Sequence, residues 1–138
     1  MPARSSFDYA IVRVVPRVDR EEFVNVGVIV YCLERDFLVA KIELDEQRLC
    51  SFAPNVDLSL VKPHLDSFTK IAAGGKDAGP IGQLPQKDRW HWLVAPRSTI
   101  IQTSAVHSGI AESPETAVEK LLDKVVRPPK PPSSNQKP

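Results

Sequence analysis

The run of residues 26–33, VGVIVYCL, constrains the fold of this chain more than any other segment because it is almost unbroken apolar sequence. A run of this length that is rich in β-branched side chains and lacks polar alternation is typical of a strand buried on both faces. We therefore expect it to be a central strand of a sheet. Gly27 lies inside the run, where glycine weakens a strand, and this indicates a bulge or the close approach of another backbone segment.

Two further strands are predicted on either side of this run in the sequence. Residues 7–15 (FDYAIVRVV) are rich in β-branched residues, and Pro16 ends the segment because proline cannot donate to a strand ladder. Residues 37–44 (FLVAKIEL) follow the polar connection 34–36. Alternate residues form one apolar face, and the polar residues Lys41 and Glu43 lie on the opposite face. Three such strands in sequence predict an antiparallel meander.

Two main helices are expected after the meander. The first begins near Asp57, a good N-cap, and its apolar side chains recur at steps of three and four until the glycine pair 74–75 ends it. Pro63 falls inside this stripe, where proline should kink the helix or mark a second start. The second helix begins after the N-cap Ser113, with Pro114 at its first position and basic residues toward its end.

The segments between these elements are shorter and less regular. Residues 45–49 predict a single helical turn, residues 76–86 a loop with glycine and proline, and residues 98–106 (STIIQTSAV) another strand. The run 90–94 is too short for its periodicity to distinguish a helix from a strand. Together these patterns predict an α+β fold: an antiparallel sheet of about four strands, with an N-terminal three-strand meander and two main helices packed on it.

The length of the chain suits one domain, which we place at residues 1–126. Residues 127–138 are rich in proline and have no apolar residue able to anchor them, so we expect a disordered tail. The tail holds three of the 18 basic residues and none of the 17 acidic ones, which leaves residues 1–126 with a net charge of −2. Such a near-neutral body disfavours non-specific binding of nucleic acids.

Composition also bears on location and on metal binding. No apolar run approaches the roughly 18 residues of a membrane helix, and the N-terminus lacks the apolar core of a signal peptide, so we expect a cytoplasmic protein. Cys32 and Cys50 are then expected to be reduced and inert. The sequence has no Cys-x-x-Cys or paired Cys/His spacing, and its three histidines fall in no metal-binding pattern, so we expect no metal and no cofactor.

A dense charged segment lies between the first two predicted strands. Arginines there suit the binding of an anion through forked hydrogen bonds, with Glu22 as an acid, a base or an orienting group. The alternative is a solvated hairpin end whose charges pair with one another, with Asn25 satisfying a turn backbone. The candidate ligand- or partner-binding residues in this part of the chain are Arg13, Arg17, Arg20, Glu22 and Asn25.

A second polar cluster lies on the predicted strand 98–106 and beside it. Alternate residues of a strand share a face, so Ser98, Gln102 and Ser104 would form a polar line in an otherwise apolar fold. A serine and a histidine suit nucleophilic catalysis, but no Gly-x-Ser-x-Gly turn is present, and Ser98 lies nine residues from His107. A polar ledge for a ligand or a partner is better supported. The candidate residues are Arg97, Ser98, Gln102, Ser104 and His107.

Three blocks of the chain resemble a bacterial family known as domain-of-unknown-function family 3037. The strongest block is residues 13–32, RVVPRVDREEFVNVGVIVYC; the others are the helix 57–74, with the sequence HLD inside it, and residues 92–109, WLVAPRSTIIQTSAVHSG. The resemblance extends over residues 7–126 and implies no established activity. Genes of this family often lie beside genes of HipA-like kinases, so the resemblance implies a HipA-like kinase as a partner rather than a reaction.

Three functional hypotheses follow. We expect a non-catalytic accessory module that binds a protein partner, a HipA-like kinase by the resemblance, through the hairpin end and the polar ledge. The alternative is a small enzyme for an anionic or phosphorylated substrate. In that enzyme Arg17, Arg20 and Arg97 would hold the anion, while Glu22 and His107 transfer protons. A homodimer is compatible with both, with a second copy covering the strand 26–33 or the segment Trp90–Trp92. The enzyme hypothesis requires Glu22 and His107 to converge on one site.

Overall fold

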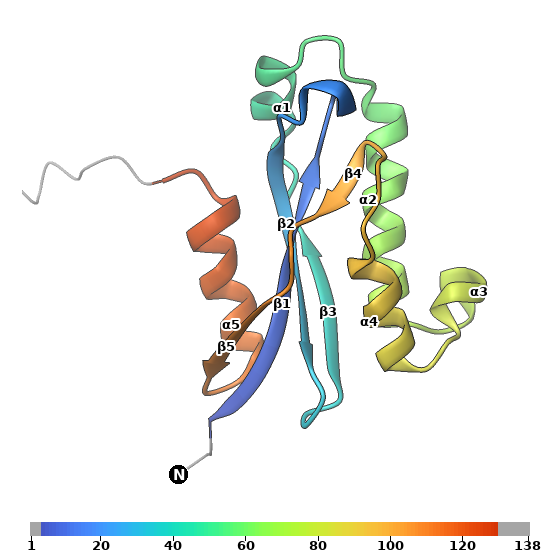
Figure 1. Cartoon of the computed structure of the whole chain (residues 1–138), viewed down its shortest axis with the longest axis vertical. Helices are drawn as coiled ribbons and strands as arrows, with labels where there is room; N and C mark the ends of the chain where they lie inside the picture. The colour runs from blue at the N-terminus through green and yellow to red at the C-terminus, as the bar shows by residue number, and fades with distance from the viewer. Residues whose placement is uncertain (1–3, 130–138) are drawn as a thin grey trace, which may run out of the picture.

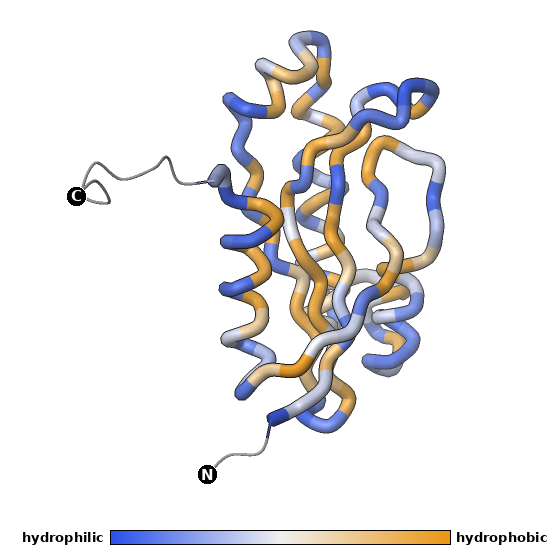
Figure 2. The backbone as a smooth tube through the Cα atoms, turned by 60° about the vertical axis from the view of Figure 1, so that its left-hand side comes forward, coloured by the Kyte–Doolittle hydropathy of each residue, from blue (hydrophilic) through white to orange (hydrophobic). Residues whose placement is uncertain are grey.

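A sheet lies between two layers of helices in the computed structural model, which describes residues 4–129 (Figure 1). One layer consists mainly of α2 (Leu58–Ala73) and α4 (Gln86–Val94). The other is α5 (Pro114–Leu121), which continues as the π-helical turn η3 (Leu122–Val126). Apolar residues concentrate in the strands between the two layers, while the outer helix surfaces are largely hydrophilic (Figure 2). The chain therefore covers both faces of its own sheet.

The strands of the sheet are arranged around β1 (Ser5–Val14), which has antiparallel partners on both edges. β2 (Val24–Cys32) follows one edge of β1 and pairs in turn with β3 (Phe37–Ile42), which confirms the predicted meander. The other edge of β1 pairs with two short strands, β4 (Ile101–Thr103) and β5 (His107–Ala111). The fold is α+β, as predicted, with the order β3-β2-β1-β4 and with β5 also paired to β1.

The apolar strand β2 is buried on both faces, as its sequence predicts. Val28 and Val30 pack in the core beneath α5 and η3, whereas Ile29 and Tyr31 pack in the core beneath α2 and α4. Trp90 of α4 stacks on Tyr31, with 5.4 Å between the ring centroids. Because one chain provides this cover, neither β2 nor Trp90 requires a second copy, and the argument for a homodimer from these two segments no longer applies.

The predicted strand 98–106 is wrong in its bounds, because the chain forms two short strands separated by a break at residues 104–106. The side chain of Ser104 explains the break. Its Oγ accepts a hydrogen bond of 2.8 Å from the backbone N–H of Ile11, and its own N–H donates to the Ile11 carbonyl at 2.8 Å. A side-chain oxygen thus replaces a backbone partner, and the strand pairing resumes only at β5. Ser104 therefore has a structural role.

The predicted start and end of α2 and the predicted start of α5 are confirmed, whereas the second start considered at Pro63 is absent. Asp57 caps α2 by accepting a hydrogen bond from the Ser59 N–H at 2.9 Å, and Ser113 caps α5 in the same way. Gly74 ends α2 with a φ of 78°, in the left-handed region that favours glycine. A single helix runs through Pro63, because this residue is exposed and water can reach the Ser59 carbonyl left without a helical partner.

The shorter connections contain more helix than the sequence predicts. α1 (Glu46–Phe52) is longer than the expected single turn. The predicted loop 76–86 contains the 3-10 turn η2 (Lys76–Ala78) and the short helix α3 (Gly79–Gly82). The ambiguous run 90–94 belongs to α4, whose two buried side chains lie three residues apart, as on one side of a helix.

Gly27 lies where the backbones of two neighbouring strands come close together. A Cβ atom at this position would lie 2.6 Å from the carbonyl oxygen of Lys41 and 2.6 Å from Cδ1 of Ile42. The pairing register between β1 and β2 also shifts between Val12 and Arg13, opposite this point. Both features that the sequence indicates for Gly27, a bulge and a close backbone approach, are therefore present.

Candidate functional site

The connection between β1 and β2, residues 15–23, lines two pockets at one end of the sheet. It contains the 3-10 turn η1 (Val18–Arg20), after which Glu21 adopts a left-handed φ of 58°. The first pocket, which we name the Arg13 pocket, has a volume of about 460 Å³ and is lined by Arg13, Val15, Val18, Glu21, Phe23, Arg97, Ser98 and Gln102. The second, which we name the Phe52 pocket, has a volume of about 320 Å³ and is lined by Pro16, Arg17, Arg20, Glu22, Phe52, Ala53, Pro54, Asn55 and Val56.

Arg13 lines its pocket from β1, where it pairs with Asn25 on one side and Gln102 on the other. Its Cζ atom lies 4.0 Å from the centroid of the Phe23 ring. Its Nε atom is buried and has no hydrogen-bond partner, and within residues 4–129 no carboxylate forms an ion pair with this guanidinium. Partial burial lowers the pKa of Arg13 below its ordinary value. Because buried charges are normally paired, this cation lacks an expected partner.

Arg97 follows α4 and closes the end of that helix. Its Nη1 donates to the Leu93 carbonyl at 2.8 Å, and its Nη2 donates to the Trp92 carbonyl at 2.6 Å. The guanidinium also stacks on two rings, at 4.5 Å from the Trp92 centroid and 5.0 Å from the Phe68 centroid. Burial lowers the pKa of Arg97. Arg97 thus gives the Arg13 pocket a second positive charge, while its Nη1 and Nη2 groups serve the fold.

The Arg13 pocket combines positive charge with hydrogen-bonding groups and an apolar wall. Glu21 is its one acidic lining residue against two arginines, so the lining has a net positive charge. Gln102 is held in place by a hydrogen bond of 2.9 Å from its Nε2 to the Thr99 carbonyl. Val18 and Phe23 are each 41% exposed and supply apolar surface. The pocket is therefore suited to a small anionic group carried next to an apolar one.

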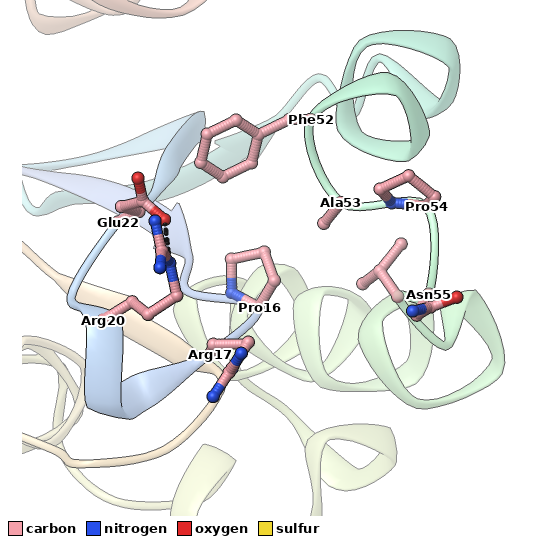
Figure 3. Close-up of a pocket in the computed structure, with 9 residues that line it drawn as sticks. Pro16, Arg17, Arg20, Glu22, Phe52, Ala53, Pro54 and Asn55 are labelled. Carbon is pink, nitrogen blue, oxygen red and sulfur yellow. Dashed lines mark hydrogen bonds and ion pairs between the residues drawn. The ribbon is translucent and has the colours of Figure 1, made fainter.

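The Phe52 pocket has a different character, because the charges around it pair with one another. Arg17 binds Asp19 at 2.7 Å and Arg20 binds Glu22, both at exposed positions. Figure 3 shows the second pair on one side of the pocket and Phe52 with the following residues on the other. The hydrogen bond from Arg20 lowers the pKa of Glu22. This is the solvated, self-paired hairpin end that the simpler interpretation predicts for these charges, and such pairs contribute little to stability.

Asn25, although predicted as a site residue, is directed away from both pockets. Its Nδ2 donates to the carbonyl of Val125 at 3.0 Å, and its Oδ1 is buried without a hydrogen-bond partner in the described chain. Arg48 of α1 donates in a similar way to the carbonyl of Val126 at 3.2 Å. These two bonds satisfy carbonyl groups at the end of η3, so Asn25 helps to attach the C-terminal helix to the sheet.

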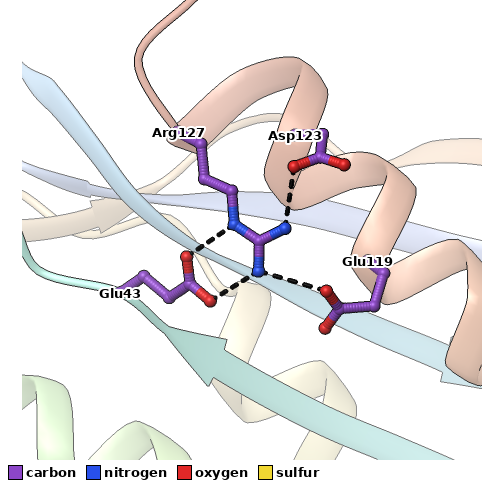
Figure 4. Close-up of polar contacts among 4 residues, drawn as sticks. All are labelled: Glu43, Glu119, Asp123 and Arg127. Carbon is purple, nitrogen blue, oxygen red and sulfur yellow. Dashed lines mark hydrogen bonds and ion pairs between the residues drawn. The ribbon is translucent and has the colours of Figure 1, made fainter.

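Arg127 completes this attachment, although the sequence places it in the tail (Figure 4). It binds both carboxylate oxygens of Glu43, at 2.8 and 2.7 Å, and it also binds Asp123 at 2.7 Å and Glu119 at 3.1 Å. Such a bidentate pair is the stronger kind of arginine–carboxylate bond. Arg127, the first residue of the predicted tail, is thus bonded to Glu43 and to the C-terminal helix. Most of the predicted disordered tail, from residue 130 onward, lies outside the described residues.

Stability should depend on pH through Glu43. Hydrogen bonds from Arg127 lower the pKa of the Glu43 carboxyl in the folded chain, against the opposing effect of burial. The stabilisation of the fold by ionised Glu43 is therefore present at pH values above about 4.3, the pKa of glutamate in the unfolded chain. It is lost as the pH falls through the lower pKa that Glu43 has in the folded chain. We predict that Glu43→Gln lowers the melting temperature by a few degrees at pH 7 and that this difference shrinks by pH 3.

Thermal unfolding of the wild-type chain and the variant between pH 7 and pH 3 measures this effect. Glu34→Gln, at an exposed residue with no hydrogen bond or ion pair among those described, is the matched control. A difference between wild type and Glu43→Gln that stays constant down to pH 3 would contradict the prediction.

Glu22 and His107 do not converge, so the structure does not assemble the proton-transfer pair that the enzyme hypothesis requires. His107 begins β5, where it pairs with Tyr9 and lies 5.3 Å from the Tyr9 ring, centroid to centroid. Glu22 lies in the connection that follows Val14, the last residue of β1. The strand from Tyr9 to Val14 alone spans about 17 Å at about 3.4 Å per residue. Neither His107 nor the structural Ser104 lines either pocket.

The described residues provide no other chemical site of the kinds considered from the sequence. No group of three or more His, Cys, Asp or Glu side chains within residues 4–129 is placed to hold a metal ion. Cys32 is buried and Cys50 is half-buried, and both are free thiols. Among the helices of the described chain, none has the length and apolar character needed to cross a membrane.

Comparison with known proteins identifies the family of the chain. The model of one family, described as a protein of unknown function (DUF3037), matches residues 9–126. The chain belongs to the DUF3037 family. The match runs from β1 to η3, so both pockets lie within the region that defines the family. No curated protein and no solved structure matches the chain.

For this DUF3037 chain, sequence reasoning missed the apolar residues of the two pockets. Val18 and Phe23 lie in the charged connection, and Phe52 ends α1; all three are exposed. An apolar side chain inside an otherwise polar turn is the signal that could have identified the first two. Phe52 gives no such signal, because only the fold brings the end of α1 next to the β1–β2 connection.

Proposed function

We propose that this DUF3037 chain is a non-catalytic accessory module of the bacterial cytoplasm that binds a protein partner through the Arg13 and Phe52 pockets. The observation that supports this most directly is the guanidinium of Arg13, which is partly buried, carries no ion pair and lies beside exposed apolar side chains. A buried donor without an acceptor costs a folded chain free energy, which the contact between Arg13 and the Phe23 ring offsets only in part. A partner that supplies the missing hydrogen-bond acceptor would gain binding free energy from this contact.

The surface around the two pockets has the composition of a protein interface. Val18 and Phe23 are 41% exposed and Phe52 is 45% exposed, and arginines surround them. Aromatic residues and arginine are enriched where proteins bind one another, and they supply most of the residues whose truncation weakens binding strongly. The exposed apolar side chains and the arginines lie on both sides of one short connection, so a single partner can contact both pockets.

An enzymatic function has less support from the same residues. Two of the arginines assigned to the substrate anion, Arg17 and Arg20, are paired with carboxylates of the chain itself. The third, Arg97, uses two of its nitrogen atoms to hold the end of α4. The proposed acid and base lie apart along the sheet. We therefore retain the binding function and propose a HipA-like kinase, the partner implied by the family resemblance, as the first candidate.

Affinity purification from the native cell lysate tests this function, with the wild-type chain and two variants as baits. Phe52→Asp places a charge in the Phe52 pocket. Ile110→Asp makes the same change in β5, at a side chain that is 68% exposed and lies outside both pockets, and is the matched control. We predict that the wild-type chain and Ile110→Asp retain one protein in near-equal amounts, and that Phe52→Asp retains at most a tenth of it.

Thermal unfolding of both variants verifies that they fold. The proposal is contradicted if the wild-type chain retains no protein in near-equal amounts, or if Phe52→Asp retains as much of the partner as Ile110→Asp does. Mass spectrometry of the retained protein identifies it. A protein other than a HipA-like kinase would refute that choice of partner.

A further inference from the structure

The Arg13 pocket leaves the hydrogen-bonding capacity of one guanidinium unused. Guanidinium groups carry five N–H donors in a planar fork that matches a carboxylate. The buried Nε–H of Arg13 has no acceptor within residues 4–129, and the ring of Phe23 covers the guanidinium from one side. No group of the described chain satisfies this donor, so an acceptor for it has to come from outside those residues.

The second arginine of the pocket has both of its terminal nitrogens bonded to the protein. Arg97 already donates through Nη1 and Nη2 to the carbonyls of α4, and the carboxylate of Glu21 lines the same pocket. One guanidinium therefore remains for a ligand. Phosphate-binding sites usually combine several cationic or backbone N–H donors around a dianion, whereas a carboxylate needs one fork and carries one charge. The donor set favours a carboxylate.

The surroundings of Arg13 indicate what carries this carboxylate. Val15, Val18 and Phe23 form an apolar wall along the pocket, so the carboxylate arrives with apolar atoms beside it. The Phe52 pocket, with Pro16 and Phe52 in its lining, lies on the other side of the same short connection. An extended peptide carries a carboxylate and apolar side chains within a few residues of each other. A free inorganic anion carries a negative charge but no apolar group.

We infer that the guanidinium of Arg13 binds the carboxylate of an aspartate or glutamate side chain in an acidic segment of the protein partner, through a forked pair of hydrogen bonds that includes Nε–H. This inference rests on the proposed partner-binding function and names the chemistry of its contact. No bond is made or broken, and the pocket acts by replacing the water around both charges with a matched pair.

Nuclear magnetic resonance of the full chain labelled with ¹⁵N tests the inference directly, because it reports on Nε–H. The probe is the blocked peptide acetyl-Ala-Glu-Ala-amide, and acetyl-Ala-Gln-Ala-amide is its matched neutral control. The Nε–H resonance of Arg13 is assigned by its absence from the spectrum of Arg13→Met. We predict a saturable shift of this resonance with the glutamate peptide, at least tenfold larger than with the glutamine peptide at equal concentration.

Inorganic phosphate and the variant Arg4→Met complete the experiment. Arg4→Met makes the same substitution at an exposed arginine that lies outside both pockets, and it should leave the response of Arg13 unchanged. The inference is overturned if the two peptides shift the resonance equally, if neither shifts it, or if phosphate saturates the site at lower concentration than the glutamate peptide. Because no partner protein is present, these outcomes are separate from success or failure of the affinity purification.

Discussion

Replacing Gly27 with alanine will lower the free energy of unfolding by about 3 kcal/mol, since a group inserted into a packed site costs about 1–3 kcal/mol and more where backbone must move. The new methyl group would lie 2.6 Å from the backbone carbonyl oxygen of Lys41 on the neighbouring strand. This oxygen belongs to the paired backbone of β3 and cannot turn aside as a side chain can. The sheet must open locally, at the strand that both cores share.

Gly109→Ala is the matched control for this prediction, because it makes the same change in another strand of the sheet. The added Cβ would meet the end of the Phe7 ring at 2.6 Å, and a side chain can rotate away. We expect the loss to be about 1 kcal/mol or less. Chemical denaturation of the three proteins measures both values. Equal losses for Gly27→Ala and Gly109→Ala would show that the backbone approach at Gly27 is not the cause.

Arg13→Met will weaken partner binding about thirtyfold or more, which corresponds to about 2 kcal/mol, while it does not lower the stability of the fold. Methionine keeps an unbranched apolar stem beside Phe23 but removes every N–H donor. The variant loses a cation–π contact worth about 0.5–1 kcal/mol and is relieved of a buried unpaired donor that costs about 1–3 kcal/mol. The loss is the smaller of the two, so we expect Arg13→Met to be no less stable than the wild-type chain, and more stable by at most about 2.5 kcal/mol.

Weaker partner binding without a loss of stability distinguishes a binding residue from a structural one. Denaturation measures the stability of Arg13→Met and of the control Arg4→Met. Arg13→Met should unfold at or above the wild-type midpoint, and Arg4→Met close to it. A residue that holds the fold would behave differently: Arg97, which bonds two carbonyls of α4, should lose stability and binding together when it is replaced. A large loss of stability in Arg13→Met would place Arg13 in the same structural class.

Local patterns in the sequence predict much of this fold. The two-sided burial of β2, the caps at Asp57 and Ser113 and the special position of Gly27 all follow from a few neighbouring residues. Each depends on short-range chemistry: the alternation of side chains along a strand, or a side-chain oxygen that reaches the first helical N–H groups. The family match over residues 9–126 agrees with the predicted resemblance.

Long-range contacts explain what the sequence could not predict. The break between β4 and β5 depends on a bond between Ser104 and Ile11, which are 93 positions apart. The separate placements of Asn25 and His107 likewise depend on partners far away in the chain. A polar side chain that bonds a distant backbone group has the same kind of sequence neighbours as one that binds a ligand. The sequence alone therefore cannot distinguish these two roles.

The candidate site shows the same limit. Ten polar residues were predicted for it, and seven line the two pockets: Arg13, Arg17, Arg20, Glu22, Arg97, Ser98 and Gln102. Their roles differ in ways that only the contacts reveal. Arg17 and Arg20 are paired, Arg97 closes a helix, and Arg13 alone of these arginines has neither an ion pair nor a hydrogen bond among the described residues.

The affinity of the partner for the wild-type chain, Arg13→Met and Arg4→Met is the measurement that tests the central claim most directly. Isothermal titration calorimetry with the purified partner gives all three dissociation constants under one set of conditions. The account predicts that Arg13→Met binds about thirtyfold more weakly or worse, and that Arg4→Met binds within about threefold of wild type because Arg4 is exposed and lies outside both pockets. Equal affinities for the wild-type chain and Arg13→Met would contradict it.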